Sequence, residues 1–196
     1  MMRLALTALA LLSMAQAPAP PAFSTSDAQS LSRKLQAIER RKQMRDTRPE
    51  TILVTEGELN SYLNLDPAAK LPKGVSEVIV RVDREDRVQA RGMVDLEAVK
   101  PKVPWIGFGP LMFLGGSVPV EIKGRLRTSG DGFGAIEVED LRMASIPVPI
   151  SVLEQLVSSS TRTEENPQGF DIRAPFRLPY SVKRVRLEPG QGYLDF

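Results

Sequence analysis

Carboxylates are the side chains of this 196-residue chain that could do acid/base chemistry, because the sequence contains neither histidine nor cysteine. Without those residues no Ser-His-Asp triad, no imidazole base and no zinc site of the usual kind can form. Glu137 and Glu139 are spaced to share one face of a strand, where exposed charge explains them better than catalysis. Asp83, Glu85 and Asp86 are interleaved with arginines, which indicates a charged turn rather than a calcium loop. We therefore predict no enzymatic activity, no bound metal and no cofactor.

The longest uncharged run outside the N-terminal region is VPWIGFGPLMFLGGSVPV, residues 103–120, and it contains the single tryptophan. Prolines and glycines interrupt this run at intervals that a lipid-facing helix would not contain, so a membrane span is rejected. Two interpretations stay open. Either the large side chains fill one end of the core, or they form an apolar surface that meets lipid.

The N-terminus predicts export. Residues 1–17 combine Arg3, an apolar run and small residues at the end, which is the layout of a signal peptide cleaved after residue 15 or 17. An uncleaved anchor helix is the alternative, but the run is shorter than the usual span of about 20 residues. Residues 18–23 form a Pro-rich spacer. We expect a protein of the periplasm or the extracellular space, with membrane association left open, whose fold depends on its core alone because it lacks disulfides.

The remaining residues, 24–196, are predicted to form a single α+β domain. Residues 24–46 read as an amphipathic helix in which Ser26 and Gln29 have capping-box spacing. Its basic side could meet anionic lipid headgroups or simply face solvent. A short strand at 51–54 leads into a helix over 55–65, which Thr55 and Glu58 should cap reciprocally.

From residue 75 the apolar period changes to two, which is typical of strands. Residues 75–82 and 87–96 predict one antiparallel hairpin, and 117–129 and 134–144 predict a second, joined by a Gly-Asp-Gly turn. A helix over 147–160 should follow, with strands near 182–188 and 192–196. Hairpins in series favour a strongly curved antiparallel sheet wrapped around one or two amphipathic helices.

Three stretches together resemble a known family: LVTEGELNSYL (53–63), DLRMASIPVPISVLEQLVSSS (140–160) and FRLPYSVKRVRLEPGQGYLDF (176–196). They are similar to segments of bacterial envelope proteins of the tubular lipid-binding (TULIP-like) superfamily, including the phospholipid-binding family linked to lipomannan elongation. The resemblance implies a curved sheet around a long helix, an apolar groove for acyl chains, and no catalytic residue to carry over.

These observations predict an exported, non-enzymatic lipid-binding protein of the cell envelope whose partner is a phospholipid or another acyl lipid. The predicted lipid-binding residues come from the uncharged run and the facing helix: Trp105, Ile106, Phe108, Leu111, Met112, Phe113, Leu114, Leu153, Leu156 and Val157. Lys100 and Lys102 are the predicted headgroup contacts. The alternative is a structural or assembly module of the envelope with a packed interior and a protein partner. Basic and acidic residues, 26 and 24, nearly balance, so nucleic acid is not an expected partner.

Overall fold

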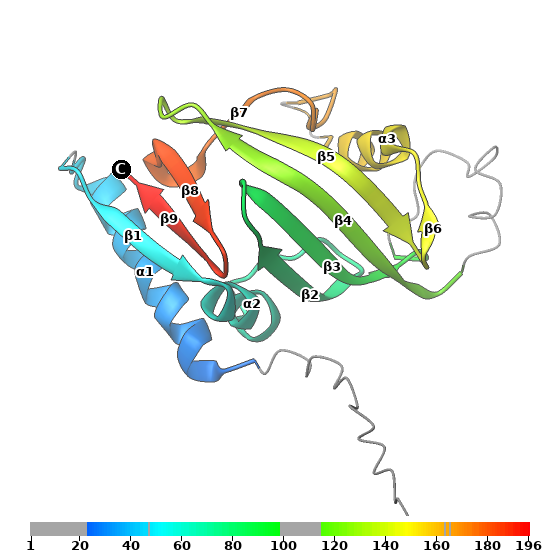
Figure 1. Ribbon diagram of the computed structural model, residues 1–196, viewed down its shortest axis with the longest axis horizontal. Helices are drawn as coiled ribbons and strands as arrows, with labels where there is room; N and C mark the ends of the chain where they lie inside the picture. The colour runs from blue at the N-terminus through cyan, green and yellow to red at the C-terminus, as the bar shows by residue number, and fades with distance from the viewer. Residues whose placement is uncertain (1–22, 47, 99–114, 163, 165) are drawn as a thin grey trace, which may run out of the picture.

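The fold is α+β, with a strongly curled antiparallel sheet and a few helices (Figure 1). The computed structural model describes residues 23–46, 48–98, 115–162, 164 and 166–196. At this level of description the predicted fold class is confirmed.

The larger sheet has six strands in the order β2 (Val75–Val82), β3 (Arg87–Asp95), β4 (Ser117–Thr128), β5 (Phe133–Met143) and β6 (Ile146–Pro147), with β7 (Phe176–Arg177) also paired to β5. Both predicted hairpins are present as β2-β3 and β4-β5. The turn of the second hairpin places Gly130 and Gly132 at φ values of 87° and 89°, which L-residues with a side chain rarely adopt. The Gly-Asp-Gly prediction is therefore confirmed.

A second, three-stranded sheet was not expected. Strand β9 (Gln191–Asp195) lies between β1 (Thr51–Thr55) and β8 (Arg184–Glu188). The register joins Thr51 to Asp195 and Thr55 to Gln191, so the first strand of the chain pairs with the last. Local patterns predicted each strand but contain no information on this distant pairing, and the expectation of one sheet is corrected to two.

Helix α1 (Thr25–Gln43) buries Ala28, Leu31 and Ile38 and packs against α2. Its cap is Ser24, whose side chain accepts a hydrogen bond from the Asp27 amide, so the predicted cap at Ser26 is wrong. Ser26 lies instead in the first turn, where its hydroxyl is 2.7 Å from that of Ser24.

Helix α2 (Glu56–Leu65) begins as predicted. The Glu58 amide donates to Thr55 Oγ1 at 3.2 Å, and the Thr55 amide donates to Glu58 Oε2 at 3.0 Å, which completes the capping box. Helix α3 (Ile150–Ser160) starts after Pro149, three residues later than the predicted range, and the short 3-10 helix η2 (Pro179–Ser181) precedes β8.

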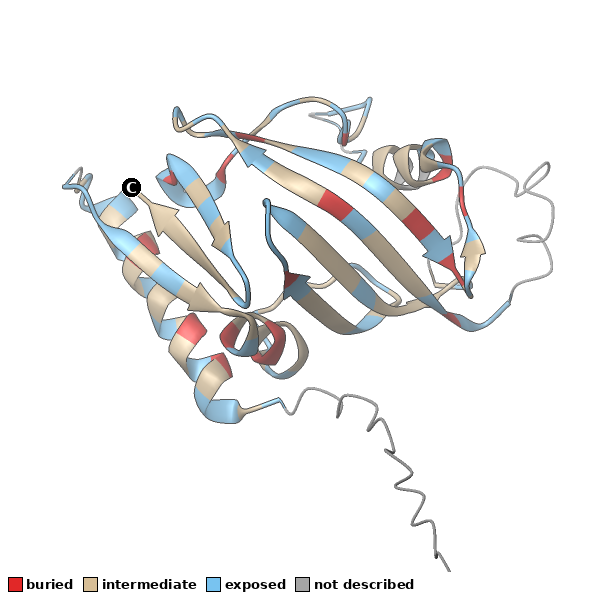
Figure 2. Cartoon of the chain, in the orientation of Figure 1, coloured by how far each residue is buried: buried red, intermediate tan, exposed pale blue. Residues whose placement is uncertain are grey.

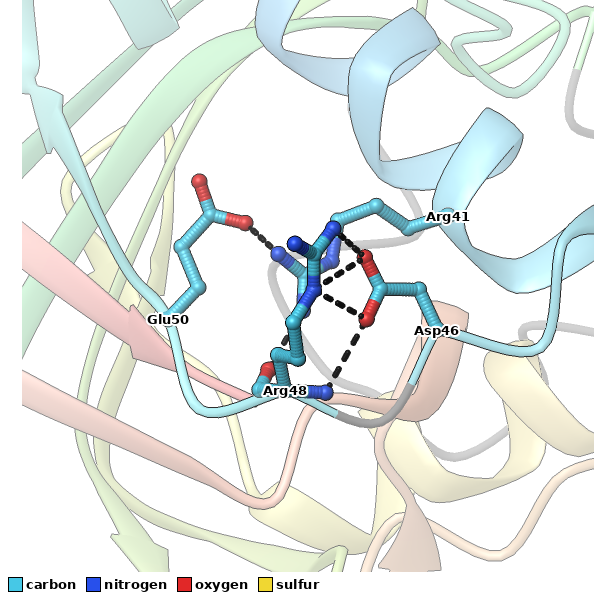
Figure 3. Close-up of polar contacts among 4 residues, drawn as sticks. All are labelled: Arg41, Asp46, Arg48 and Glu50. Atoms are coloured by element: carbon cyan, nitrogen blue, oxygen red, sulfur yellow. Dashed lines mark hydrogen bonds and ion pairs between the residues drawn. The ribbon is translucent and has the colours of Figure 1, made fainter.

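Charged side chains fix the connection from α1 to β1 (Figure 3). Arg41 pairs with Glu50 and donates to the Arg48 carbonyl, while Arg48 forms a bidentate pair with Asp46 at 3.0 and 2.6 Å. The Arg41 guanidinium also lies 5.8 Å from the ring centre of Phe196. Because each arginine has a carboxylate, this cluster is internally neutral and ties the end of α1 to the small sheet.

Candidate functional site

The central rows of the larger sheet differ in polarity between its two faces. Residues paired directly across antiparallel strands share a face, and the register places Val80, Ala90, Ile122 and Leu141 in one row across β2 to β5. The adjacent row on this face contains Val82, Val88, Gly124 and Val138. An aliphatic surface therefore runs across four strands, and we call it the apolar face.

The opposite face carries charge. Its rows are Ile79, Arg91, Glu121 and Arg142, followed by Arg81, Gln89, Lys123 and Asp140. A surface pocket of about 650 Å³ includes Arg91, Glu121 and Arg142 in its lining. Lys123 Nζ lies 3.0 Å from Glu121 Oε1, and Arg142 Nε lies 3.0 Å from Asp140 Oδ2. Part of the charge on this face is therefore already paired. The lining of this pocket also includes Phe23, Ile79 and Met93, so it combines charged and apolar side chains.

Helix α3 covers only part of the apolar face. Val152, 2% exposed, packs with Val118, Leu141, Met143 and Val148 at the β5-β6 side of the sheet. Further along β5 the surface is less protected, since Ile136 on the same face is 42% exposed. Figure 2 shows the buried segments of β4 and β5 separated by intermediate and exposed ones. The apolar face thus extends beyond the helix that packs on it.

Helix α2 closes the opposite edge of the sheet with side chains instead of a strand. Three side chains spaced one helical turn apart make hydrogen bonds to this edge. Glu56 accepts from the Val82 amide, and Asn60 bonds both the amide and the carbonyl of Val80. Asn64 donates to the Val78 carbonyl. The edge strand β2 therefore has hydrogen-bond partners on both sides. This arrangement fixes α2 against the β2 edge of the sheet.

The predicted site residues are only partly placed. Trp105, Ile106, Phe108, Leu111, Met112, Phe113 and Leu114, together with Lys100 and Lys102, lie outside the described residues and stay predictions. Leu153 and Val157 are half-buried on α3, and Leu153 packs against the cluster around Val152. Leu156 belongs to α3, but its side chain is also outside the described set.

The described residues that flank positions 99–114 lie next to each other. The Leu96 amide donates to the Gly116 carbonyl at 3.0 Å, which brings the end of β3 beside the start of β4. Leu96 also packs against the cluster that contains Val118 and Val152. The chain on either side of residues 99–114 is thus anchored next to α3.

Sequence reasoning missed two kinds of residue. Val152 is the most deeply buried residue of α3, although the predicted apolar face of the helix did not include it. Asn60 was not among the predicted site residues, but it lies in the middle of α2 and is buried against β2. The alternation in β4 and β5 could have identified Ile136 as part of the apolar face, whereas nothing local to Asn60 identifies its partner.

Shifted pKa values among the described residues have local causes. A hydrogen bond from Arg186, then one from Thr51, lowers the pKa of Asp195 to about 2. A hydrogen bond from Arg48 likewise holds the pKa of Asp46 far below its usual range. Both carboxylates serve ion pairs that join neighbouring strands or loops. In the described part of the chain no group of three or more potential metal ligands converges.

Comparison with known proteins gives no match: no family model fits the chain, and no curated protein or solved structure is significantly similar to it. Within the described ranges, no helix has the length and apolar character needed to span a bilayer.

Proposed function

We propose that this protein is an exported, non-enzymatic lipid carrier or lipid-binding protein of the cell envelope, which holds acyl chains against the apolar face of its curled sheet. The observation that carries the proposal is the aliphatic surface that runs from β2 to β5. Helix α3 packs only on the part of this surface near β5 and β6. Acyl chains match such a surface because burying methylene groups is worth about 0.8 kcal/mol each.

Three further features support this function. The resemblance of residues 53–63, 140–160 and 176–196 to tubular lipid-binding proteins agrees with a curled antiparallel sheet. The N-terminal pattern indicates export to a compartment where lipids are handled. The run that contains Trp105 and Phe108 follows Leu96, which packs against the cluster that includes Val152 of α3.

The experiment is a fluorescence titration of the purified protein with an environment-sensitive fluorescent fatty acid. We expect saturable enhancement of emission. The Ile136→Glu variant should weaken binding by at least about tenfold, because a carboxylate on the apolar face must be buried or must displace the chain. Leu53→Glu is the matched control, since Leu53 is 39% exposed but lies on β1 of the other sheet.

Two results would count against an acyl site. One is the absence of saturable enhancement with the wild-type protein. The other is an equal loss of binding in the Ile136 and Leu53 variants, which would indicate nonspecific adsorption. Ile136 and Leu53 are already partly exposed in the folded protein. Circular dichroism should therefore show that both variants stay folded.

The alternative function, an assembly module of the envelope, is favoured by one observation. Strand β1 forms an edge of the small sheet and exposes Leu53 there. An edge strand can pair with a strand of another protein. Cross-linking that captures a partner through β1 in the wild type and fails in a Leu53→Pro variant would support it.

A further inference from the structure

A second pocket, of about 510 Å³, lies where the end of α1, the β4-β5 turn and the segment around η2 meet. It is distinct from the apolar face and from the pocket on the charged face. Its lining includes three cationic side chains from three parts of the chain, namely Lys42 of α1, Arg177 of β7 and Lys183 between η2 and β8. We call it the cationic pocket.

The charge of the cationic pocket is not balanced by the described residues. Asp131 is its only carboxylate, and that group already accepts hydrogen bonds from Ser129 Oγ and the Phe133 amide. Lys42 and Lys183 form no ion pair or side-chain hydrogen bond within the described ranges, and Arg177 stacks over the Phe133 ring at 5.5 Å. The adjacent Arg41, by contrast, is neutralised by Glu50 (Figure 3).

The walls of the cationic pocket are fixed by backbone hydrogen bonds. The Gly132 amide donates to the Lys183 carbonyl at 3.0 Å, and the Leu178 amide donates to the Gly132 carbonyl at 2.8 Å. Between them Tyr180 and Ser181 adopt φ values of 57° and 64°, which are unfavourable for residues with a side chain. Strained backbone of this kind persists only where its surroundings hold it, and it is concentrated at binding sites.

We propose that the cationic pocket binds a phosphate group. Lysine and arginine charges that outnumber the nearby carboxylates repel one another, and a phosphate oxygen is an acceptor that both side-chain types bind well. The hydroxyl groups of Tyr180 and Ser181 belong to lining residues and offer further donors.

The phosphate could belong to a soluble phosphate ester or to a phospholipid headgroup. Leu178 lines the cationic pocket and lies close to Gly134 on the apolar face, so the two surfaces adjoin. The phosphate site stands on its own geometry, and only its assignment to a lipid headgroup rests on the proposed acyl-binding function.

The test is isothermal titration of the full chain with inorganic phosphate and pyrophosphate at low ionic strength. Sedimentation with vesicles of phosphatidylglycerol, compared with vesicles of phosphatidylcholine, forms the second arm. Lys183→Gln and Arg177→Gln should each weaken binding by about tenfold. Arg33→Gln is the control, because Arg33 is an exposed cation of α1 outside the pocket. Since Lys183 and Arg177 are exposed, melting temperatures should stay close to that of the wild type.

Saturable binding that Lys183→Gln and Arg177→Gln weaken and Arg33→Gln leaves intact would support the phosphate site. If the anionic vesicles show the same dependence, the phosphate is a lipid headgroup; if only the soluble anions do, it belongs to a soluble ester. No saturable binding of any probe, or equal weakening by Arg33→Gln, would overturn the proposal. Failure of fatty-acid binding alone would overturn the acyl function and leave the phosphate site standing.

Discussion

The side-chain amide of Asn60 makes both backbone hydrogen bonds of Val80. Asn60 Nδ2 donates to the Val80 carbonyl at 2.9 Å, and the Val80 amide donates to Asn60 Oδ1 at 2.7 Å. A single helical residue, 4% exposed, thereby takes the place that a neighbouring strand would occupy along β2. This contact connects the helical part of the fold to the edge of the curled sheet and protects that edge from pairing with other chains.

Replacing Asn60 with Ala should destabilise the protein by about 2–4 kcal/mol, because the Val80 amide and carbonyl both lose their partner. Chemical denaturation with urea measures this free energy. Asn64→Ala is the matched control on the same helix face, since Asn64 reaches β2 through one bond to the Val78 carbonyl. Its cost should be about 1 kcal/mol. An equal loss of unfolding free energy in the two variants would show that the two hydrogen bonds of Asn60 hold α2 to β2 no better than the single bond of Asn64.

Glu58 should contribute to stability in a pH-dependent way. Burial by itself raises the pKa of this carboxyl, but hydrogen bonds from Lys34, Ser30 and the Thr55 amide, with the charge of Lys34, outweigh burial and hold the pKa below 4.5. A carboxyl whose pKa is lower in the folded state stabilises the fold above its unfolded pKa. That contribution is lost as the pH falls through the folded value.

The Glu58→Gln variant should therefore be less stable than the wild type by about 1–2 kcal/mol at neutral pH. The difference should shrink as the pH falls below 4.5. Urea unfolding at a series of pH values measures it. Glu77→Gln, at an exposed position of β2, is the control and should follow the wild type throughout. A difference that is independent of pH would contradict the ion-pair account.

Two glycines should respond to alanine in opposite directions. A Cβ at Gly124 would lie 2.6 Å from the Glu137 carbonyl oxygen, at the point where the β4-β5 register shifts. Backbone must move to accept it, so Gly124→Ala should cost about 1–3 kcal/mol. A Cβ at Gly57, in the first turn of α2, would meet its nearest atom, Asp27 Oδ2, at 3.4 Å, which is ordinary contact.

Gly57→Ala should therefore stabilise the protein by about 0.5 kcal/mol, because alanine loses less backbone entropy than glycine in a helix. Thermal unfolding of the two variants beside the wild type checks both signs. A stabilised Gly124→Ala variant would mean that the paired strands are further apart at this position than the structure shows.

Local sequence signals predicted the elements of this fold well. Thr55 and Glu58 are spaced as a capping box requires, and α2 begins there. The alternation of apolar and polar residues located both hairpins, because the side chains of a strand with one apolar face have a period of two.

Long-range pairing was the part that the sequence did not reveal. The hydrogen bond between Thr51 and Asp195 joins the first strand to the last, and neither strand contains a local signal for the other. The buried amide of Asn60 was missed for the same reason, since its partner belongs to a strand that follows the helix. The choice of Ser24 over Ser26 as the α1 cap depends on a further tertiary contact, because the Ser24 amide donates to Ser61 Oγ at 3.0 Å.

The predicted lipid-binding site stays a prediction, because most of its residues lie outside the described part of the chain. An apolar surface on a curved sheet followed from the strand pattern, and Leu153 and Val157 are half-buried on the helix that packs there. The cationic pocket was not anticipated, because Lys42, Arg177 and Lys183 are far apart in the chain and only the fold brings them together.

The central claim, that the apolar face holds acyl chains, is tested most directly by native mass spectrometry of the protein purified under mild conditions, followed by extraction and identification of lipid. We predict a mass increment that corresponds to a lipid bound in a fixed ratio. The increment should be retained by Leu53→Glu and lost in Ile136→Glu. A protein that carries no lipid in any of the three forms, and that does not take up added phospholipid, would contradict the claim and favour an assembly module with a packed interior.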